Sequence, residues 1–189
     1  MPLLSRIEGC EPLRPVHAAV ASTAAMDKIA TEVAIQLKVV SRRDPDLVIV
    51  LWDREQSDQC PGGLARDLYD QILQQSQATY SLRVVFMDRM FENWLIAALP
   101  TLRGLQTRFR LSKADVGSIC PNKADQVDAL ALIKKSVTHD QYEKALDAKR
   151  IPAGANVDEM AAHSRGFRRF LDCLRHPAYL HQSRSPRRP

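Results

Sequence analysis

The chain has few of the features that mark the common classes of enzyme and secreted protein. Its 189 residues include only four cysteines, none of them in a C-x-x-C pair. A disulfide framework and a zinc site are therefore disfavoured, and reduced thiols in a cytoplasmic protein are expected. The five histidines show no ligand spacing, and there is no G-x-S-x-G elbow, P-loop or G-x-G-x-x-G. ATP hydrolysis and dinucleotide chemistry by this chain are unsupported.

Long apolar runs are also missing. No stretch approaches the ~20 apolar residues of a membrane span. The N-terminal MPLLSRIEGCEP carries Glu8 and Glu11 and lacks the apolar core of a signal peptide. Hydrophobic residues nevertheless make up 45% of the chain, enough for a domain with a real core. We expect one domain over residues 1–181 with no membrane contact.

Charge is distributed unevenly along the chain. The net charge is +5, yet residues 165–189 hold seven arginines and one acid, Asp172, so they carry +6 and the remainder carries about −1. This Arg-rich C-terminal end is suited to nucleic acid or another acidic partner. The alternative is a solvated, disordered tail, which the composition of residues 182–189 favours.

Hydrophobic periodicity in residues 13–99 predicts alternating strands and helices. The predicted strands are 13–20, which Pro15 weakens, 47–52 and 81–87. Ser22 or Thr23 is the expected cap of the first helix. The expected apolar stripe of the first helix is Met26, Ile29, Val33 and Leu37. The second helix is marked by Leu64, Leu68, Ile72 and Leu73. The expected inner face of the third is Phe91, Trp94, Leu95 and Ala98. This order predicts an α/β fold with a small parallel sheet flanked by helices.

Residues 101–181 are expected to form a mainly helical extension. The pattern predicts a basic loop over 101–121 and a connector over 151–156. A helix is expected to begin at Asn122 or Lys123 and to turn Val127, Leu130 and Ala131 inward, and a short one is expected over 140–148. Ser164 is the expected cap of a last helix that carries Phe167, Phe170, Leu171 and Leu174 and ends before Pro177.

Two acids follow the apolar run 47–52, which is predicted to be buried on both faces. Asp53 and Glu55 come at its end, and the alternation of a strand turns Arg54 away from them. Ligands of open α/β sheets bind beyond the carboxyl ends of strands, and carboxylates are suitable ligands for Mg²⁺ or Mn²⁺. The alternative interpretation is a solvated acidic turn.

Glu92 follows the next strand, and its position allows two interpretations. An acid at a helix start is stabilised by the helix dipole by ~0.3–1 kcal/mol, which is a sufficient structural reason for it. If the strands 47–52 and 81–87 are neighbours, Glu92 instead shares a metal site with Asp53 and Glu55. Lys123, at a predicted helix start, is a candidate phosphate contact.

Five segments follow one another along the chain between residues 11 and 174. They are LVIVLWDREQSDQCP, FENWLIAALPTLRG, PNKADQVDAL, QYEKALDAKRI and HSRGFRRFLDCL. In this order they resemble an uncharacterised bacterial Toprim-like family, related to the Toprim part of overcoming-lysogenisation-defect nucleases. The family pattern normally begins with a strand that ends in Glu-Gly-x-x-Glu. RIEGC contains Glu8 and Gly9 without such a strand, so either Met1 is not the true start or that strand is lost.

The resemblance implies a Mg²⁺- or Mn²⁺-dependent nuclease-type subunit that acts on nucleic-acid phosphodiesters. In this interpretation Asp53, Glu55 and Glu92 are catalytic metal ligands and Lys123 is a further catalytic residue. An ATPase partner and a role in phage defence are implied as well, and a homo-oligomer is compatible with the sequence. The alternative is a non-catalytic interaction subunit that retains the fold, which the absence of the first-strand Glu favours.

Removal of the basic tail is expected to weaken binding to mixed-sequence DNA and to reduce its salt dependence. Phosphate contacts release counterions and carry no sequence information. The measurement compares the full chain with a chain ending at Gln182 across a salt series. Equal affinities and equal salt slopes would show that the tail is only a solvated end.

Overall fold

The computed structural model describes residues 4, 7, 9–55, 57–76, 79–102, 105 and 107–180. They form two compact units. The sheet unit comprises Leu13–Asp88, and the helical unit comprises Met1–Pro12 and Arg89–Pro189. Glu8, Arg103 and the predicted tail 182–189 lie outside the described residues. Within the described part, no helix is both long and apolar enough to cross a membrane.

The described sheet consists of two parallel strands, β1 (Leu47–Asp53) and β2 (Ser81–Met87). Leu47 lies opposite Ser81 and Asp53 lies opposite Met87, so the carboxyl ends of both strands meet at one edge. The predicted strands 47–52 and 81–87 and the predicted α/β class with a small parallel sheet are confirmed. That residues 1–181 fold as a single domain stays a prediction.

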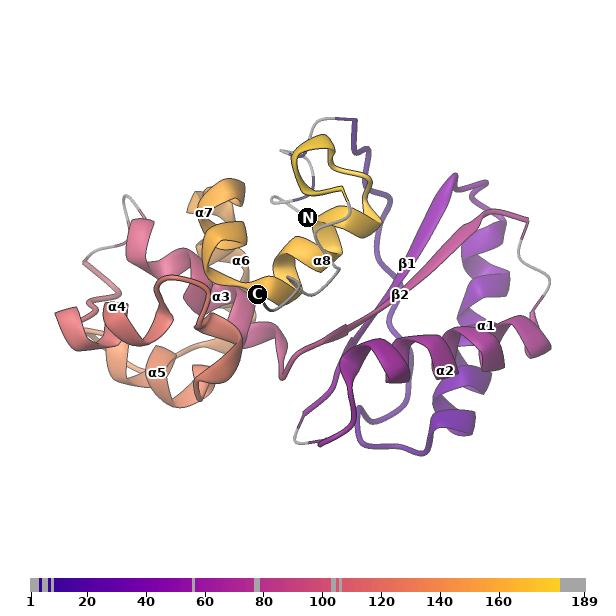
Figure 1. Ribbon diagram of the computed structural model, residues 1–189, viewed down its shortest axis with the longest axis horizontal. Coiled ribbons are helices and arrows are strands. Elements are labelled where there is room, and N and C mark those ends of the chain that lie inside the picture. Colours follow the sequence, from indigo (N-terminus) through magenta and orange to yellow (C-terminus); the bar gives the residue numbers. More distant parts are fainter. Residues whose placement is uncertain are drawn as a thin grey trace, which may run out of the picture. The chain divides into compact units, whose positions relative to one another are not determined.

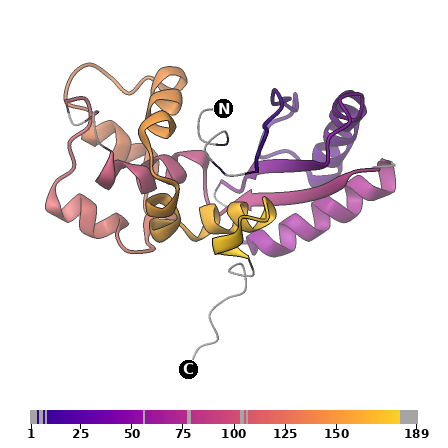
Figure 2. The same ribbon diagram turned by 90° about the horizontal axis from the view of Figure 1, so that it is seen from above.

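Two helices, α1 (Met26–Ser41) and α2 (Pro61–Gln75), lie on the same side of the sheet (Figure 1). The crossover from β1 to β2 needs a helix to bring the chain back to the starting edge, and α2 runs back along the strands (Figure 2). The predicted inner face of α1 is confirmed for Ile29, Val33 and Leu37. The core between helices and sheet is made by Ile29, Ala30, Val33, Leu37, Trp52, Leu64, Ala65, Leu68, Ile72, Leu82, Val84 and Phe86.

The segment before α1 differs from its prediction. Residues 13–20 form no strand, because Pro15 lacks the N–H that a ladder needs. The segment instead packs Ala18 and Val20 against the core. The predicted caps Ser22 and Thr23 are wrong as well, since Ala25 occupies the N-cap position of α1 and provides no side-chain hydrogen bond.

Burial in the sheet unit also corrects the sequence prediction for β1. β1 was expected to be buried on both faces, but only Trp52, at 8% exposure, is fully buried, and the other strand residues are half-buried. The described sheet has two strands, so β1 pairs with β2 along one edge alone. The predicted second helix is confirmed as α2, which contains all four marker residues; of these, Leu73 is 43% exposed.

The helical unit is built around α3 (Phe91–Ala98), which packs against α5 (Ala129–Ser136), α6 (Lys144–Gly154) and α7 (Val157–His163) (Figure 1). Every residue of α3 from Glu92 to Ala98 is buried. The predicted inner residues Trp94, Leu95 and Ala98 are therefore confirmed. The remaining described helices of this unit are η2 (Leu99–Thr101), α4 (Lys113–Ile119), η3 (Ala124–Gln126), α8 (Arg165–Cys173) and η4 (Pro177–Tyr179).

Residues 101–121 of the helical unit differ from the prediction. The expected basic loop 101–121 contains α4, which Ser112 begins with a capping box: its hydroxyl accepts a bond from Asp115 N at 3.1 Å and the Asp115 carboxylate accepts one from Ser112 N. The Asp115 pKa is lowered to about 2 by hydrogen bonds from Lys135 and Ser112.

Two helix boundaries are also corrected. The helix expected from Asn122 or Lys123 begins at Ala129, after the cap Asp128, and turns Ala129, Ile133 and Ser136 inward while Ala131 is exposed. The helix expected over 140–148 is α6, which runs on through most of the expected connector 151–156, with Ile151 and Pro152 buried. Burial of this apolar pair against the unit outweighs the low helix propensity of proline.

The predicted cap and most of the predicted apolar stripe of the last helix, α8, are confirmed, whereas Leu174 is its half-buried C-cap. Ser164 accepts a hydrogen bond from Phe167 N at 2.9 Å, which satisfies one of the free N–H groups at the start of α8. Phe167, Phe170 and Leu171 are buried. The indole of Trp94 packs edge-on against Phe167, with ring centroids 5.4 Å apart, and at a tilt against Phe170, with ring centroids 5.1 Å apart.

Trp94→Ala is expected to lower the free energy of unfolding by ~3–5 kcal/mol, since it opens a large cavity in this aromatic cluster. Chemical denaturation of both proteins, followed by circular dichroism, measures the loss. Leu146→Ala in the same unit, where the side chain is 43% exposed, is the control and should change stability by less than about 1 kcal/mol. Similar losses for the two variants would contradict the packing role of Trp94.

Candidate functional site

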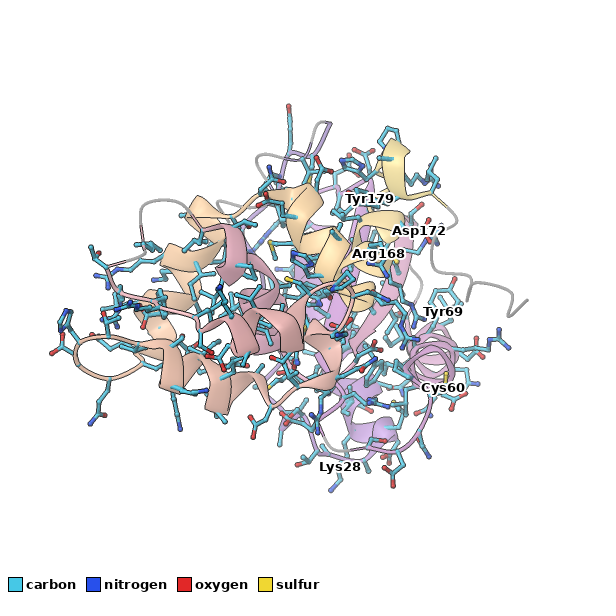
Figure 3. The ribbon with its side chains drawn as sticks, turned by 60° about the vertical axis from the view of Figure 1, so that its left-hand side comes forward. Lys28, Cys60, Tyr69, Arg168, Asp172 and Tyr179 are labelled. Atoms are coloured by element: carbon cyan, nitrogen blue, oxygen red, sulfur yellow. The ribbon has the colours of Figure 1, made fainter. Side chains whose placement is uncertain are left out.

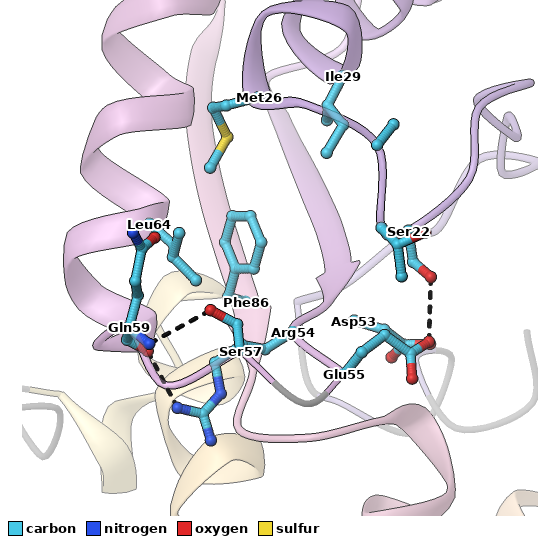
Figure 4. Close-up of a pocket in the computed structure, with 12 residues that line it drawn as sticks. Ser22, Met26, Ile29, Asp53, Arg54, Glu55, Ser57, Gln59, Leu64 and Phe86 are labelled. Carbon is cyan, nitrogen blue, oxygen red and sulfur yellow. Dashed lines mark hydrogen bonds between the residues drawn. The ribbon is translucent and has the colours of Figure 1, made fainter.

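A pocket of about 650 Å³ lies at the carboxyl edge of the sheet, within the sheet unit. One wall is apolar and the other is polar (Figure 4). The apolar wall is formed by Ala24, Met26, Ile29, Leu64 and Phe86, and the polar wall by Ser22, Thr23, Asp53, Arg54, Glu55, Ser57 and Gln59. The pocket therefore occupies the place where α/β sheets commonly bind ligands.

Asp53 and Glu55 lie together on the polar wall, as the sequence predicted for these two residues (Figure 4). Asp53 is the last residue of β1, and Glu55 follows it in the turn. Both side chains are half-buried, so each is held by the fold while it stays open to the pocket. This arrangement places two carboxylates beside one space.

Glu55 adopts a left-handed backbone conformation, with φ of 57°. A side chain in this region meets the following carbonyl, which costs roughly 1–2 kcal/mol. Outliers of this kind concentrate at functional sites, where the surroundings hold them in place. Here the turn brings the Glu55 carboxylate back over the strand end, where Oε1 accepts a hydrogen bond of 3.0 Å from the Ser22 hydroxyl (Figure 4).

Ser22 is the site residue whose role sequence reasoning missed. It was expected to cap α1, but its hydroxyl binds Glu55 instead. The Trp52 indole N–H donates to the Ser22 carbonyl at 3.1 Å and so fixes this segment against the strand that carries Asp53. The only signal in the sequence was a serine shortly before a helix, and such a pattern predicts a cap more readily than a contact across 33 residues.

Arg54 directs its guanidinium away from the two carboxylates, as alternation predicted. Its Nε donates to the Asp88 carbonyl at 2.6 Å and a terminal nitrogen donates to the Gln59 carbonyl at 3.0 Å. These bonds tie the acidic loop to the end of β2 and to the chain that enters α2. The loop therefore keeps the shape that positions Asp53 and Glu55.

The donor set of the pocket fits a hard divalent cation. Carboxylate and hydroxyl oxygens are the ligands that Mg²⁺ and Mn²⁺ prefer, and the pocket provides them from Asp53, Glu55 and Ser22. In the described part of the chain, no group of three or more His, Cys, Asp and Glu side chains could hold a metal ion. Among the described residues, Asp53 and Glu55 would give such a site two carboxylate ligands.

Glu92 belongs to the helical unit, where the structure gives it a local role. Its side chain is 2% exposed, and its Oε1 lies 2.8 Å from the Nζ of Lys144 on α6. This ion pair connects α3 to α6. Whether Glu92 also joins Asp53 and Glu55 stays a prediction, and a metal would have to compete with Lys144 for the carboxylate.

Lys123 also lies in the helical unit, just before η3 rather than at the start of a long helix. Its ammonium donates to the Gly117 carbonyl at 3.1 Å, and its side chain is exposed. The local geometry leaves it reachable from solvent. Its role as a phosphate contact stays a prediction.

Comparison with known proteins places the chain in a family. The family model described as Domain of unknown function (DUF4276) matches residues 8–175. The chain belongs to this family. An uncharacterised domain family was what the resemblance of residues 11–174 predicted, and the match confirms that part. No curated protein and no solved structure matches this DUF4276 chain.

In this DUF4276 protein, Lys144→Met is expected to destabilise the fold more than Glu92→Gln. The lysine variant leaves a buried carboxylate without its cation, at a penalty of ~1–3 kcal/mol. The glutamine variant leaves an ammonium that is 74% exposed and therefore solvated. Chemical denaturation of each variant measures the difference.

The double variant Lys144→Met with Glu92→Gln provides the control, because it removes both charges. It should be more stable than Lys144→Met alone. A double variant at least as unstable as the lysine variant would show that the pair is held by something other than charge.

Proposed function

We propose that this DUF4276 protein is a Mg²⁺- or Mn²⁺-dependent, Toprim-like nuclease subunit that acts on nucleic-acid phosphodiesters. The observation that supports the proposal most directly is the shared pocket of Asp53 and Glu55 at the carboxyl edge of a parallel sheet. The strained backbone of Glu55 adds to it, since the turn holds a carboxylate where a smaller residue would relieve the strain.

Asp53 and Glu55 would hold the cation, which would stabilise charge on the phosphate and lower the pKa of a bound water. The protein side of the mechanism is positioning. Ser22 orients Glu55 through Oε1, and the Trp52 indole fixes Ser22. Arg54 holds the loop closed through two carbonyls, so neither carboxylate has to reorganise when substrate binds.

The electrostatic support for a nucleic-acid substrate comes from the C-terminal end. Arg165 and Arg175, on and beside α8, are exposed, so they can contact phosphates. Arg168 is less suited to bind phosphate, since its guanidinium already donates to Asn122 Oδ1 at 2.6 Å and to the Ala161 carbonyl. An ATPase partner and a role in phage defence belong to the proposal through the family resemblance.

Titration with Mn²⁺ or Mg²⁺ is expected to show weak binding that Asp53→Asn and Glu55→Gln reduce by at least about tenfold. Each variant removes one of two ligand charges and preserves side-chain size, so a loss of ~1.4 kcal/mol or more is expected. Asp58→Asn is the control, because this exposed acid lies in the same loop outside the pocket. Calorimetry measures the binding, and unchanged affinity in Asp53→Asn would overturn the metal site.

Cleavage of plasmid and single-stranded DNA or RNA with Mg²⁺ then separates the enzyme from the alternative function. Loss of cleavage in Asp53→Asn and Glu55→Gln, with retention in Asp58→Asn, is the result expected of a nuclease. Metal binding without cleavage by the wild-type chain would favour a non-catalytic interaction subunit that retains the fold.

A further inference from the structure

Cys120 and His163 form a close thiol–imidazole pair in the helical unit. The Cys120 sulfur lies 3.3 Å from Nε2 of His163. Cys120 follows the last residue of α4, and His163 is the last residue of α7. Both side chains are half-buried, so the fold holds them while small solutes can reach the sulfur.

Hydrogen bonds between the two segments fix this distance. Asn122 N donates at 3.2 Å to the carbonyl of the residue just before His163, which joins the chain after Cys120 to the end of α7. Arg168, which projects from α8 (Figure 3), donates to Asn122 Oδ1 at 2.6 Å. Three segments of the helical unit therefore hold the pair.

Burial favours the neutral forms of both side chains, and two nearby charges partly oppose it. Burial raises the pKa of the Cys120 thiol, and the Lys123 ammonium lowers it by a smaller amount. Burial lowers the pKa of the His163 imidazole, and the Glu159 carboxylate raises it by a smaller amount. At rest the pair is therefore a neutral thiol beside a neutral imidazole. Lys123 stabilises the thiolate and Glu159 stabilises the imidazolium when they form.

We propose that Cys120 is a modification site for small hydroperoxides, with His163 as its base. A base within hydrogen-bond distance is the arrangement that activates weak nucleophiles in proteins. The neutral imidazole can accept the thiol proton at the moment of attack, so the thiol does not need a low pKa beforehand. A half-buried sulfur favours a small oxidant over a bulky electrophile.

The step consumes one hydroperoxide and conserves atoms and electrons. The Cys120 sulfur attacks one peroxide oxygen while Nε2 of His163 accepts the thiol proton. An S–O bond forms and the O–O bond breaks. The leaving oxygen takes the proton back from His163 and departs as water or alcohol. Sulfur loses two electrons and becomes a sulfenic acid, and the peroxide gains them.

The test is the pH dependence of Cys120 oxidation by hydrogen peroxide in the full chain, with dimedone as the trap for sulfenic acid and peptide mass spectrometry as the readout. In the wild-type chain the rate at Cys120 is expected to change less than threefold between pH 7 and pH 8, because His163 is already neutral there. An unassisted thiol reacts about tenfold faster per pH unit over the same range, because its thiolate fraction rises.

His163→Gln retains the size and polarity of the side chain without its basicity. In this variant the rate at Cys120 is expected to fall at least tenfold at pH 7 and to rise about tenfold per pH unit. The exposed Cys60 of the sheet unit is the internal reference, and its rate should be the same in both proteins. A tenfold rise per unit at Cys120 of the wild-type chain would overturn the proposal even if the variant failed to fold. So would an unchanged rate at Cys120 in a folded His163→Gln.

Discussion

The parallel pairing of β1 with β2 is the constraint on which the sheet unit depends. Parallel neighbours cannot be joined by a tight turn, so residues 61–75 must form a helix that returns the chain to the starting edge. That helix needs an apolar face to pack on, and the face made by Trp52, Val84 and Phe86 provides it. The same pairing brings the two strand ends to one edge, where the loop after β1 and the segment before α1 line the pocket.

Buried charge plays a comparable part in the helical unit. Asp147 is fully buried, and the Arg108 guanidinium donates two bonds of 2.7 Å to its carboxylate. The Glu143 backbone N–H donates a further bond at 2.9 Å. These bonds hold the pKa of Asp147 below its usual range. Such a pair fixes where α6 begins, because a displaced helix would leave the carboxylate buried without its cation.

Sequence reasoning succeeded where one local pattern decides the outcome. The β-branched run at 47–52 and the apolar spacing of α1 and α8 each determine an element, and all were placed well. It failed where the deciding partner is distant. Burial of Ile151 and Pro152 against the helical unit extends α6 through a proline, and no local pattern announces that burial. Ser112 and Asp115 have the spacing of the capping box that begins α4, but the basic residues around them led to the prediction of a loop.

In the candidate site, too, the features set by local sequence were predicted and those set by distant partners were missed. Asp53 and Glu55 were predictable because they follow an unmistakable strand, and alternation also predicted the direction of Arg54. The contact between Ser22 and Glu55 spans 33 residues, and the lysine that pairs with Glu92 lies on a helix far along the chain. Both contacts depend on how separate elements pack, and neither can be read from the sequence around one of the partners.

The left-handed backbone at Glu55 has a consequence for how this chain can change. A glycine at that position would relieve the local strain, so selection for stability alone would favour loss of the carboxylate. Among the described residues, a hydrogen bond from Ser22 stabilises the glutamate side chain at this position. Stability and the retention of this carboxylate therefore pull in opposite directions. Variants selected for heat resistance alone should lose the side chain of residue 55 before they lose that of Asp53, whose extended backbone any residue can adopt.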